Sequence, residues 1–215
     1  MSVALQGSLL DLVGVGSGET AEPALRPLDA VERIPLSHGA WVDLRPGWLT
    51  GADLLFDHLA EDVPWHAERR PMYDRVVDVP RLLSFYDDGD ELPHPVLATA
   101  RSALSERYRG ELGEPFRTAG LCFYRDGRDS VAWHGDRIGR GNTEDTMVAI
   151  ISIGAPRDLL LRPRGGGTTQ RHRLGHGDLL VMGGSCQRTW EHAVPKTAKP
   201  VGPRISIQFR PHGVR

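Results

Sequence analysis

The sequence has few cysteines, no long apolar run and little net charge, and each of these absences narrows what the protein can be. Its two cysteines, Cys122 and Cys186, form no CxxC pair, so we expect no disulfide framework and a reducing, cytoplasmic setting. No stretch approaches the roughly 18 apolar residues of a transmembrane helix, and the first residues lack the basic segment of a signal peptide. We therefore expect no membrane partner.

Charges of the two signs nearly balance, with 26 Lys and Arg against 28 Asp and Glu and a formal net charge of −2. This balance does not indicate a protein that binds nucleic acid over its whole surface, so a DNA or RNA partner would need a local basic patch. A chain of 215 residues suits one domain, which buries roughly 70% of its unfolded surface without disulfides. With no repeat or heptad in the chain, we expect a monomer.

The first half of the chain predicts helices, and the second half predicts strands. Apolar residues recur at helical spacing over residues 48–62, with Thr50 as the N-cap, and again over residues 94–109. Residues 65–89 are rich in Arg, aromatics and Pro, and we expect loops and short strands there. Short apolar runs separated by turn residues then follow at residues 118–125, 130–134, 147–154, 157–163, 170–174, 177–184 and 204–210.

This order of elements predicts an α+β fold in which N-terminal helices pack on a double-stranded β-helix, or jelly roll. We divide the chain into an N-terminal extension over residues 1–30, a segment with the helices over residues 31–116, and the β core over residues 117–215. All three belong to one structural domain.

The segment Trp133-His134-Gly135-Asp136 carries the first candidate metal ligands. Alternate residues of a strand point the same way, so His134 and Asp136 project together at the end of their strand. Two such ligands and a distant histidine form a facial triad, which leaves coordination positions open as non-haem Fe(II) oxygenases require. An HxD pair alone is more often an ordinary surface feature.

The third ligand must come from elsewhere, and His192 is the best candidate. It follows a predicted strand, 56 residues after Asp136. His172 lies in a basic run and His176 in a tight turn, and we interpret both as solvent-exposed loop histidines. Without its context, His192 would be as well explained by a structural role.

Residues 204–210 alternate cleanly, with Ile205, Ile207 and Phe209 on one face and four polar side chains on the other: Arg204, Ser206, Gln208 and Arg210. A solvated edge strand is one explanation. The strand begins only 12 residues after His192, however, so its polar face can also line the metal cavity. Two guanidinium groups there can bind a dicarboxylate such as 2-oxoglutarate, one carboxylate each.

Together these parts resemble AlkB-type Fe(II)- and 2-oxoglutarate-dependent dioxygenases. Residues 124–136 resemble the family's YxDGxDxxxxHxD segment, and residues 152–158 look like the strand and turn that follow it. His192 and residues 204–210 look like the second histidine and the closing RxxxxxR. The similarity covers roughly residues 65–212 and is closest to the branch with the eukaryotic DNA-repair homologues.

The resemblance implies a set of roles. His134, Asp136 and His192 would bind Fe(II), although Mn(II), Co(II) or Ni(II) would suit the same ligands. Tyr124 and Arg204, with Ser206, would hold the distal carboxylate of 2-oxoglutarate, and Arg210 would lie beside the proximal one. The implied reaction consumes O2 and 2-oxoglutarate, oxidatively removes N-methyl groups from bases such as 1-methyladenine and 3-methylcytosine in DNA or RNA, and releases formaldehyde, succinate and CO2.

Two positions depart from the family pattern. Cys122 stands where many members have an asparagine that contacts 2-oxoglutarate, and a thiol is a poorer donor. Arg137-Ile138-Gly139-Arg140 follows the HxD, where the family often has acidic residues that help to read the damaged base. The first change affects the cofactor site, and the second bears on the substrate.

A flipped base needs an aromatic sandwich and cations for the backbone, so we interpret residues 65–86 as a nucleotide-recognition lid rather than a plain surface loop. Its candidate residues are Trp65, His66, Arg69, Arg70, Tyr73, Arg75, Arg81, Phe85 and Tyr86. Further candidates for substrate contact are Trp133, Arg137, Arg140, Arg162, Arg164, Arg157 and Asp158, of which the last two could instead form an internal ion pair.

Three functions remain open on the sequence. The first is dealkylation of DNA or RNA. The second is the same chemistry on RNA only, on a protein or on a small metabolite, which the basic residues after Asp136 and the net charge favour. The third is a binding module without turnover, which the complete set of candidate ligands and arginines argues against.

Overall fold

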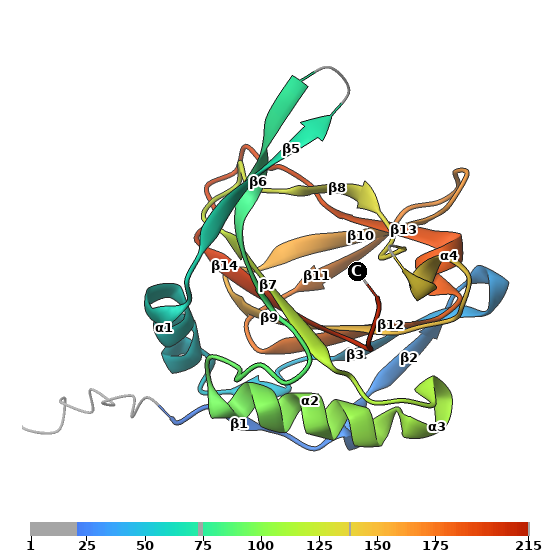
Figure 1. The fold of residues 1–215 in the computed structure, drawn as a ribbon, viewed down its shortest axis with the longest axis horizontal. Helices are drawn as coiled ribbons and strands as arrows, with labels where there is room; N and C mark the ends of the chain where they lie inside the picture. Colours follow the sequence, from blue (N-terminus) through green and yellow to red (C-terminus); the bar gives the residue numbers. More distant parts are fainter. Residues whose placement is uncertain (1–20, 73–74, 138, 215) are drawn as a thin grey trace, which may run out of the picture.

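The computed structural model describes residues 21–72, 75–137 and 139–214, and only the backbone of residues 69–72 and 75–78. Within these ranges an eight-stranded and a four-stranded sheet form, besides the short pair β1 (Ala24–Leu25) and β4 (Leu49–Thr50). Figure 1 shows how the strands surround a common interior. The larger sheet runs in the order β2 (Glu32–Pro35), β3 (Ala40–Arg45), β12 (Asp178–Gly184), β9 (Val148–Gly154), β14 (Arg204–Arg210), β7 (Thr118–Tyr124), β6 (Arg75–Tyr86), β5 (His66–Met72).

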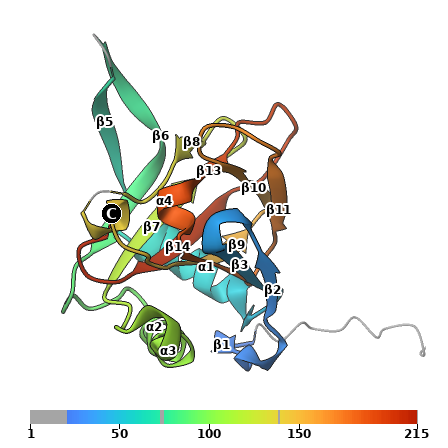
Figure 2. The same ribbon diagram turned by 90° about the vertical axis from the view of Figure 1, so that its right-hand side faces the viewer.

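The smaller sheet faces the larger one across an apolar layer (Figure 2). Its order is β11 (Gln170–Leu174), β10 (Arg157–Pro163), β13 (Trp190–Val194), β8 (Val131–His134). Val42, Ile150 and Leu180 of the larger sheet pack there with Leu159 and Leu161 of the smaller one. The two facing antiparallel sheets confirm the predicted double-stranded β-helix with helices on one side.

Strand β14 lies at the centre of the larger sheet, between β9 and β7, so the solvated edge strand considered above is excluded. Ile205, Ile207 and Phe209 are fully buried in the layer between the sheet and the helices. Because side chains alternate along a strand, the polar side chains of β14 point to the opposite face, toward the smaller sheet. The candidate site therefore lies inside the β-helix.

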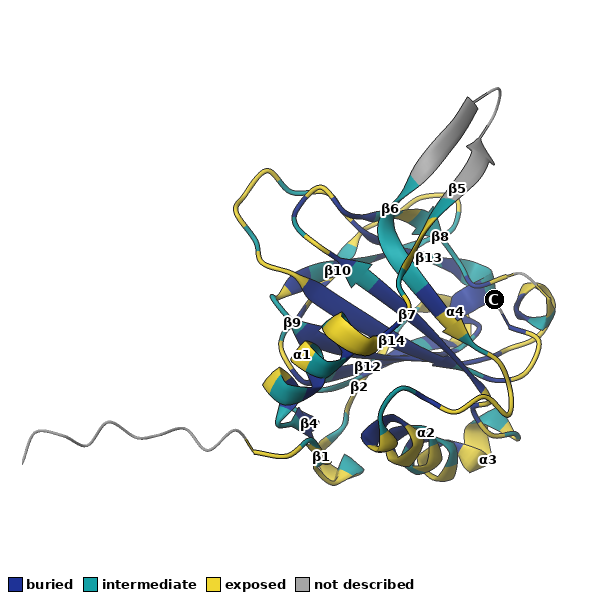
Figure 3. Cartoon of the chain, turned by 60° about the vertical axis from the view of Figure 1, so that its left-hand side comes forward, coloured by how far each residue is buried: buried dark blue, intermediate teal, exposed yellow. Residues whose placement is uncertain are grey.

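Two helices cover the outer face of the larger sheet (Figure 3). Helix α1 (Ala52–Asp62) buries Leu55 and Leu59, and helix α2 (Pro95–Arg107) buries Leu97 and Leu104, all at helical spacing. Both helices fall within the ranges that the sequence predicts. Two four-residue helices, α3 (Arg109–Leu112) and α4 (Cys186–Thr189), complete the fold together with short 3-10 turns.

The predicted N-cap of α1 was wrong. Thr50 belongs to strand β4, where it pairs with Ala24, and its hydroxyl donates to the Ala24 carbonyl at 3.2 Å. Gly51 is the N-cap instead, in the left-handed region with φ 63° and without a side-chain cap. The hydroxyl of Thr50 is committed to the short β1–β4 ladder, so it cannot also accept from the first turn of the helix.

Residues 65–89 form a long antiparallel hairpin of β5 and β6 instead of the expected loops and short strands. The second half of β6 pairs with β7 in the sheet, from Leu82 opposite Phe123 to Tyr86 opposite Ala119. The rest of the hairpin projects beyond the β-helix (Figure 1). Proline is tolerated in β5 because that strand is at the edge of the sheet, where one side of the backbone needs no partner.

Strands β2 and β3 were not predicted, and they extend the larger sheet with residues from the N-terminal half. Buried Asp43 of β3 accepts from Arg33 of β2 at 2.7 and 2.8 Å and from the Tyr108 hydroxyl at 2.9 Å. These bonds satisfy a buried carboxylate and tie the strands to the end of α2. The sheet thus crosses the expected boundary at residue 117, and the division of the chain into three parts stays a prediction.

Candidate metal centre and adjoining cavity

The HxD pair lies at the end of strand β8, as the sequence predicts. His134 is the last residue of β8, and its Nδ1 donates to the Ala132 carbonyl at 2.9 Å, which leaves Nε2 with its lone pair for a ligand. Gly135 makes the following turn possible, because a Cβ there would lie 2.6 Å from the Gln187 carbonyl oxygen. The close approach of β8 and α4 therefore requires glycine at this position.

His192 joins the pair from strand β13. It lies within that strand and not after one, which corrects the predicted boundary. His192 is the direct cross-strand partner of His134, and the two ring centroids are 4.2 Å apart. One ligand atom from each of His134, Asp136 and His192 lies within 4.8 Å of the others. The sheet register thus produces the predicted cluster of two imidazoles and a carboxylate.

Asp136 is buried and held in its ionised form. Arg210 Nε donates to its Oδ2 at 2.8 Å, and its backbone N–H donates to the Gln187 Oε1 at 2.9 Å. Burial alone would raise the pKa of Asp136, but the Arg210 guanidinium and then the two imidazoles outweigh this effect and hold the pKa well below its usual range. The second oxygen, Oδ1, faces His134 Nε2 at 3.6 Å and is left for a ligand.

Burial, and then the neighbouring His134, lower the pKa of His192 to about 3. His192 is therefore neutral at physiological pH, which is the form that binds metals. A neutral imidazole beside an ionised carboxylate and a second imidazole suits a divalent transition metal such as Fe(II). The donor set fits the metal that the resemblance implies.

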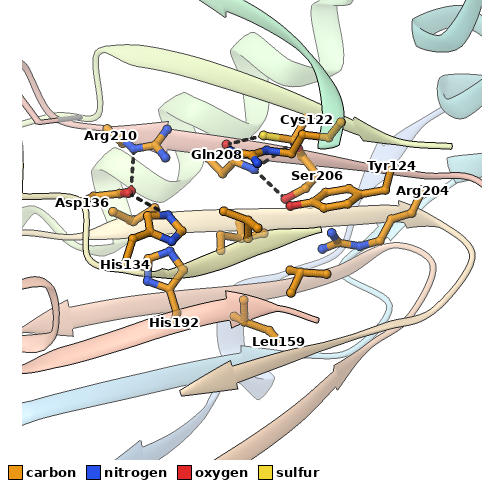
Figure 4. Close-up of a pocket in the computed structure, with 15 residues that line it drawn as sticks. Cys122, Tyr124, His134, Asp136, Leu159, His192, Arg204, Ser206, Gln208 and Arg210 are labelled. Carbon is orange, nitrogen blue, oxygen red and sulfur yellow. Dashed lines mark hydrogen bonds and ion pairs between the residues drawn. The ribbon is translucent and has the colours of Figure 1, made fainter. Parts of the chain in front are cut away.

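A cavity runs from this cluster along the polar face of β14 (Figure 4). All four polar side chains of that face line it, together with residues of β6, β7, β8, β9, β10 and β13. The lining residues are Arg81, Cys122, Tyr124, Val131, His134, Asp136, Val148, Ile150, Leu159, His192, Val194, Arg204, Ser206, Gln208 and Arg210.

The far end of the cavity holds a buried cation that lacks a full set of partners. Arg204 is 2% exposed; its Nε donates to the Ser152 hydroxyl at 2.8 Å and its guanidinium lies 5.2 Å from the Tyr124 ring centre. Among the described residues, its Nη1 is buried without a hydrogen-bond partner. Burial raises the pKa of Tyr124 to about 12, so its hydroxyl keeps its proton and can donate. A carboxylate placed here would satisfy the orphaned donor.

Between the two ends lie Cys122, Ser206 and Gln208 (Figure 4). The Cys122 thiol donates to the Gln208 Oε1 at 3.6 Å, and Gln208 Nε2 donates to the Ser206 hydroxyl at 2.7 Å. Arg81 of β6 also reaches this region, and its Nη1 donates to the Ser130 carbonyl at 3.1 Å. The structure thus brings Arg81, predicted as a substrate contact, into the cavity itself.

Arg157 and Asp158 do not line the cavity. Arg157 is buried and donates to three backbone carbonyls, those of Asp126, Asp129 and Pro195, at 2.7 to 3.0 Å. Asp158 faces Arg171 and Arg173, at 3.7 and 3.9 Å. The side chain of Arg157 is therefore bound by the protein itself, which leaves it nothing to offer a substrate. The alternative of an internal pair between the two residues is not seen either.

The aromatic candidates fall into two groups. Trp65 donates its Nε1–H to the Leu59 carbonyl at 3.0 Å and packs on Phe123, and Tyr86 packs against the same core. Trp133 directly precedes His134 in β8, so it points to the opposite face, where Arg162 covers its ring at 4.2 Å. These three positions are structural.

Phe85 is different, being the exposed large apolar side chain of the described part of the chain, at 40%. Its ring lies over Gly120, since a Cβ at Gly120 would be 3.8 Å from the ring and 3.0 Å from Arg210 Nη1. Phe85 therefore stands beside the metal end of the cavity, where a substrate must enter.

The remaining cationic candidates are mostly engaged elsewhere. Arg140 pairs with Glu114, Arg162 with Glu191, and Arg164 donates to the Arg188 carbonyl, whereas Arg137 is exposed close to Asp136. The candidates Arg69, Arg70, Tyr73 and Arg75 lie outside the described side chains.

Two histidines and one glutamine show where sequence reasoning fell short. His172 is buried in β11, 8% exposed, and not in a solvated loop as predicted, whereas His176 does lie in a turn, bonded to Gly154 N and close to Asp53. Gln187 of α4 holds the backbone of Asp136 and was not predicted; nothing in the local sequence pattern marks it.

Comparisons with known proteins agree with this geometry. Residues 50–210 match the model of the 2OG-Fe(II) oxygenase superfamily. The human alpha-ketoglutarate-dependent dioxygenase alkB homolog 3 is 32% identical over 88% of this chain and 73% of its own. The Arabidopsis thaliana DNA oxidative demethylase ALKBH2 is 26% identical over 94% of this chain and 74% of its own.

A solved structure described as "The structure of OsALKBH1" covers 84% of this chain and all of its own, with a TM-score of 0.58 and 16% identity, and supports the fold. The superfamily match spans most of the chain, and the human relative covers it nearly throughout. The chain therefore belongs to the 2OG-Fe(II) oxygenase superfamily and, within it, to the AlkB-type dioxygenases, which use Fe(II), 2-oxoglutarate and O2.

Proposed function

We propose that this dioxygenase oxidatively dealkylates N-alkylated bases of the 1-methyladenine and 3-methylcytosine type in DNA, with RNA as a second substrate. In this proposal His134, Asp136 and His192 hold Fe(II). Tyr124, Arg204 and Ser206 bind the distal carboxylate of 2-oxoglutarate. Arg210 lies beside the proximal carboxylate.

The observation that carries the cofactor assignment is the cavity with a ligand cluster at one end and a buried, incompletely bonded arginine at the other. An unpaired buried guanidinium is costly, so its presence is explained by an anionic ligand that spends part of the cycle there. A dicarboxylate that reaches from Arg204 to the metal cluster meets this requirement.

When bound, Fe(II) and 2-oxoglutarate supply an oxidant that hydroxylates the alkyl carbon, with succinate, CO2 and formaldehyde as products. The chain's own contribution is positioning. Arg210 keeps one oxygen of Asp136 occupied and leaves the other for a ligand, and the Ala132 carbonyl fixes the tautomer of His134. Arg204 and Tyr124 orient the co-substrate from a dry, apolar-walled cavity.

Nucleic acid is favoured as the substrate by two features. The relatives include a protein named DNA oxidative demethylase, and the exposed ring of Phe85 stands at the metal end of the cavity, where a flipped or single-stranded base can stack. Arg137, exposed beside Asp136, offers a cation for a phosphate or a base edge. The β5–β6 hairpin projects on the side of β6 that carries Phe85 and would act as the lid (Figure 1).

The same chemistry on a protein or a small metabolite is the second candidate. Several surface arginines near the site are paired with acidic groups, Arg125 with Asp129, Arg128 with Asp126 and Arg188 with Asp145, so the basic surface available to phosphates is reduced. The net charge of −2 agrees with this. The described residues include no helix long and apolar enough to span a membrane. The monomeric state and cytoplasmic location stay predictions.

The test is to incubate the protein with Fe(II), 2-oxoglutarate and ascorbate, with and without single-stranded DNA or RNA that contains 1-methyladenine or 3-methylcytosine. Succinate and the repaired base are followed by mass spectrometry. We expect both products from the wild type, neither from His134→Ala, and both from His58→Ala, which removes an imidazole from the surface of α1 instead. Succinate without base repair would refute nucleic acid and direct the search to proteins and metabolites. No succinate from iron-loaded wild type would refute the cofactor assignment.

A further inference from the structure

The middle of the cavity carries a side chain whose role is not explained so far, Gln208. On β14 it lies one step from Arg210 along the cavity face and two steps from Arg204, counted in alternate residues. Its carboxamide therefore belongs to the half of the cavity next to the metal cluster. At 9% exposure it is buried, and a buried amide must find partners for both its oxygen and its nitrogen.

The opposite strand makes room for this carboxamide. Gly120 of β7 is the direct cross-strand partner of Gln208. A Cβ at Gly120 would lie 3.3 Å from Gln208 Oε1 and 3.0 Å from Arg210 Nη1, which is closer than side chains normally tolerate. The absence of a side chain at this position leaves the space in which the Gln208 carboxamide and the Arg210 guanidinium lie.

The next cavity-facing residue of β7, Cys122, points at the same carboxamide. Its thiol donates to Gln208 Oε1 at 3.6 Å, and Cys122 itself is only 8% exposed. A thiol is a weak donor and a weak acceptor, so Cys122 cannot by itself provide a strong hydrogen bond in this part of the cavity. The Gln208 carboxamide occupies the place that an amide side chain at residue 122 would reach.

The carboxamide is also held from its other side. Gln208 Nε2 donates to the Ser206 hydroxyl at 2.7 Å and makes a longer contact of 3.3 Å to the Ser206 carbonyl. The nitrogen carries two hydrogens, and the short bond uses one of them. The second hydrogen, with only the long contact, is the one that an incoming carboxylate or oxo oxygen can take over. Figure 4 shows this amide between Arg210 and Tyr124.

We infer that Gln208 is a further co-substrate-binding residue, whose carboxamide donates to the oxo-acid half of 2-oxoglutarate and supplies the amide that Cys122 lacks. The inference rests on the proposed assignment of this cavity to 2-oxoglutarate. Gly120, Cys122 and Gln208 act as one unit: the glycine gives space, the thiol fills the small remaining volume, and the glutamine provides the donor from the opposite strand.

A consequence is that the position of the amide can be exchanged between the strands. Gln208→Leu keeps the approximate volume of the side chain and removes the donor. Loss of a hydrogen bond to a charged group should weaken 2-oxoglutarate binding roughly tenfold to a hundredfold. Adding Cys122→Asn to Gln208→Leu returns an amide to the same point from β7, and it should recover most of the lost affinity.

The test uses the full chain loaded with Mn(II), which cannot turn over, and measures 2-oxoglutarate binding by isothermal titration calorimetry without any nucleic acid. Mn(II) affinity and thermal unfolding of each variant are measured in parallel. We expect Gln208→Leu to bind Mn(II) as the wild type does but to bind 2-oxoglutarate more weakly, and the double variant to recover. Should Gln208→Leu unfold or lose Mn(II), Gln208→Met is judged by the same criterion.

Equal 2-oxoglutarate affinity in the wild type and in a folded, Mn(II)-binding Gln208 variant would overturn the inference. Weak binding that Cys122→Asn does not improve at all would overturn the exchange between the strands. A wild type that binds Mn(II) but no 2-oxoglutarate would instead overturn the proposed assignment of the cavity, so the two failures are distinguishable.

Discussion

Replacing Arg204 by methionine should change the protein in opposite directions with and without co-substrate. Arg204 is fully buried, only its Nε has a bond, to Ser152, and its Nη1 is orphaned among the described residues. In the protein without 2-oxoglutarate this guanidinium is a buried charge with too few partners. Methionine has a similar length and no polar group, so it removes the cost.

The size of the effect follows from the contacts. Exchanging a poorly paired buried charge for an apolar side chain is often neutral or stabilising by about 1–4 kcal/mol. Against this, the variant loses the bond to Ser152, worth about 1 kcal/mol, and the contact with the Tyr124 ring, worth about 1–2 kcal/mol. We therefore expect the unfolding free energy without co-substrate to rise by about 0–2 kcal/mol, or up to roughly 6 °C in Tm. Affinity for 2-oxoglutarate should fall at least tenfold, because a charge-assisted hydrogen bond contributes about 1.5–3 kcal/mol.

Thermal unfolding of the Mn(II)-loaded protein, with and without 2-oxoglutarate, measures both effects. The matched control is Arg157→Met, because Arg157 is a second buried arginine beside the Tyr124 ring whose donors are all bound to backbone carbonyls. If Arg204→Met were clearly less stable than the wild type without co-substrate, or if 2-oxoglutarate still raised its Tm as in the wild type, the reasoning would be refuted.

Three further predictions concern stability and metal binding. Arg157→Met orphans three backbone carbonyls and should lower the unfolding free energy by about 3 kcal/mol or more in urea denaturation; a loss below about 1 kcal/mol would contradict this. Burial lowers the pKa of His172 below 6.5, so as pH falls through 6.5 the unfolded chain binds a proton that the folded chain refuses. The loss of stability from about pH 7 to about pH 5 should therefore be smaller in His172→Gln than in the wild type, and equal slopes would disprove it. Mn(II) at about 100 times its Kd should stabilise the wild type by about 2.7 kcal/mol and leave His192→Ala unchanged, as calorimetry of both proteins can check.

The metal cluster was predictable because it follows from strand alternation. His134 and Asp136 share a face as residues i and i+2, and the regular pattern of residues 204–210 marks Arg204 and Arg210 as facing one cavity. Both patterns are local, and tertiary structure had only to bring the faces together. His192 was found despite an unpredicted strand, because its distance along the chain matched the family pattern.

Other features depend on contacts that no local pattern records. Gln187 reaches the backbone of Asp136 from a four-residue helix, too short to show periodicity. His172 looks exposed between two arginines, yet alternation in β11 turns the arginines outward and the imidazole inward. Thr50 is a good cap by residue type, but the β1–β4 ladder claims its hydroxyl. In each case the winning interaction lies far away in sequence.

The β5–β6 hairpin and strands β2 and β3 were missed for a related reason. Their sequences mix proline, charged and apolar residues, which weakens the alternation that identifies a strand. What defines them is pairing with β7 and β12, whose own patterns are strong. Strands recruited to a well-formed sheet need less intrinsic preference of their own.

The pairing of His134 with His192 ties metal binding to the alignment of one short strand. Strand β8 has four residues, lies at the edge of the smaller sheet, and meets β13 through an irregular register. Sliding β8 by one residue would turn Trp133 inward and His134 outward, because side chains alternate. An ion shared by His134, Asp136 and His192 opposes that slip as a rivet would, fastening a weak edge at a single point. Metal affinity and the alignment of this strand are thus two expressions of one equilibrium.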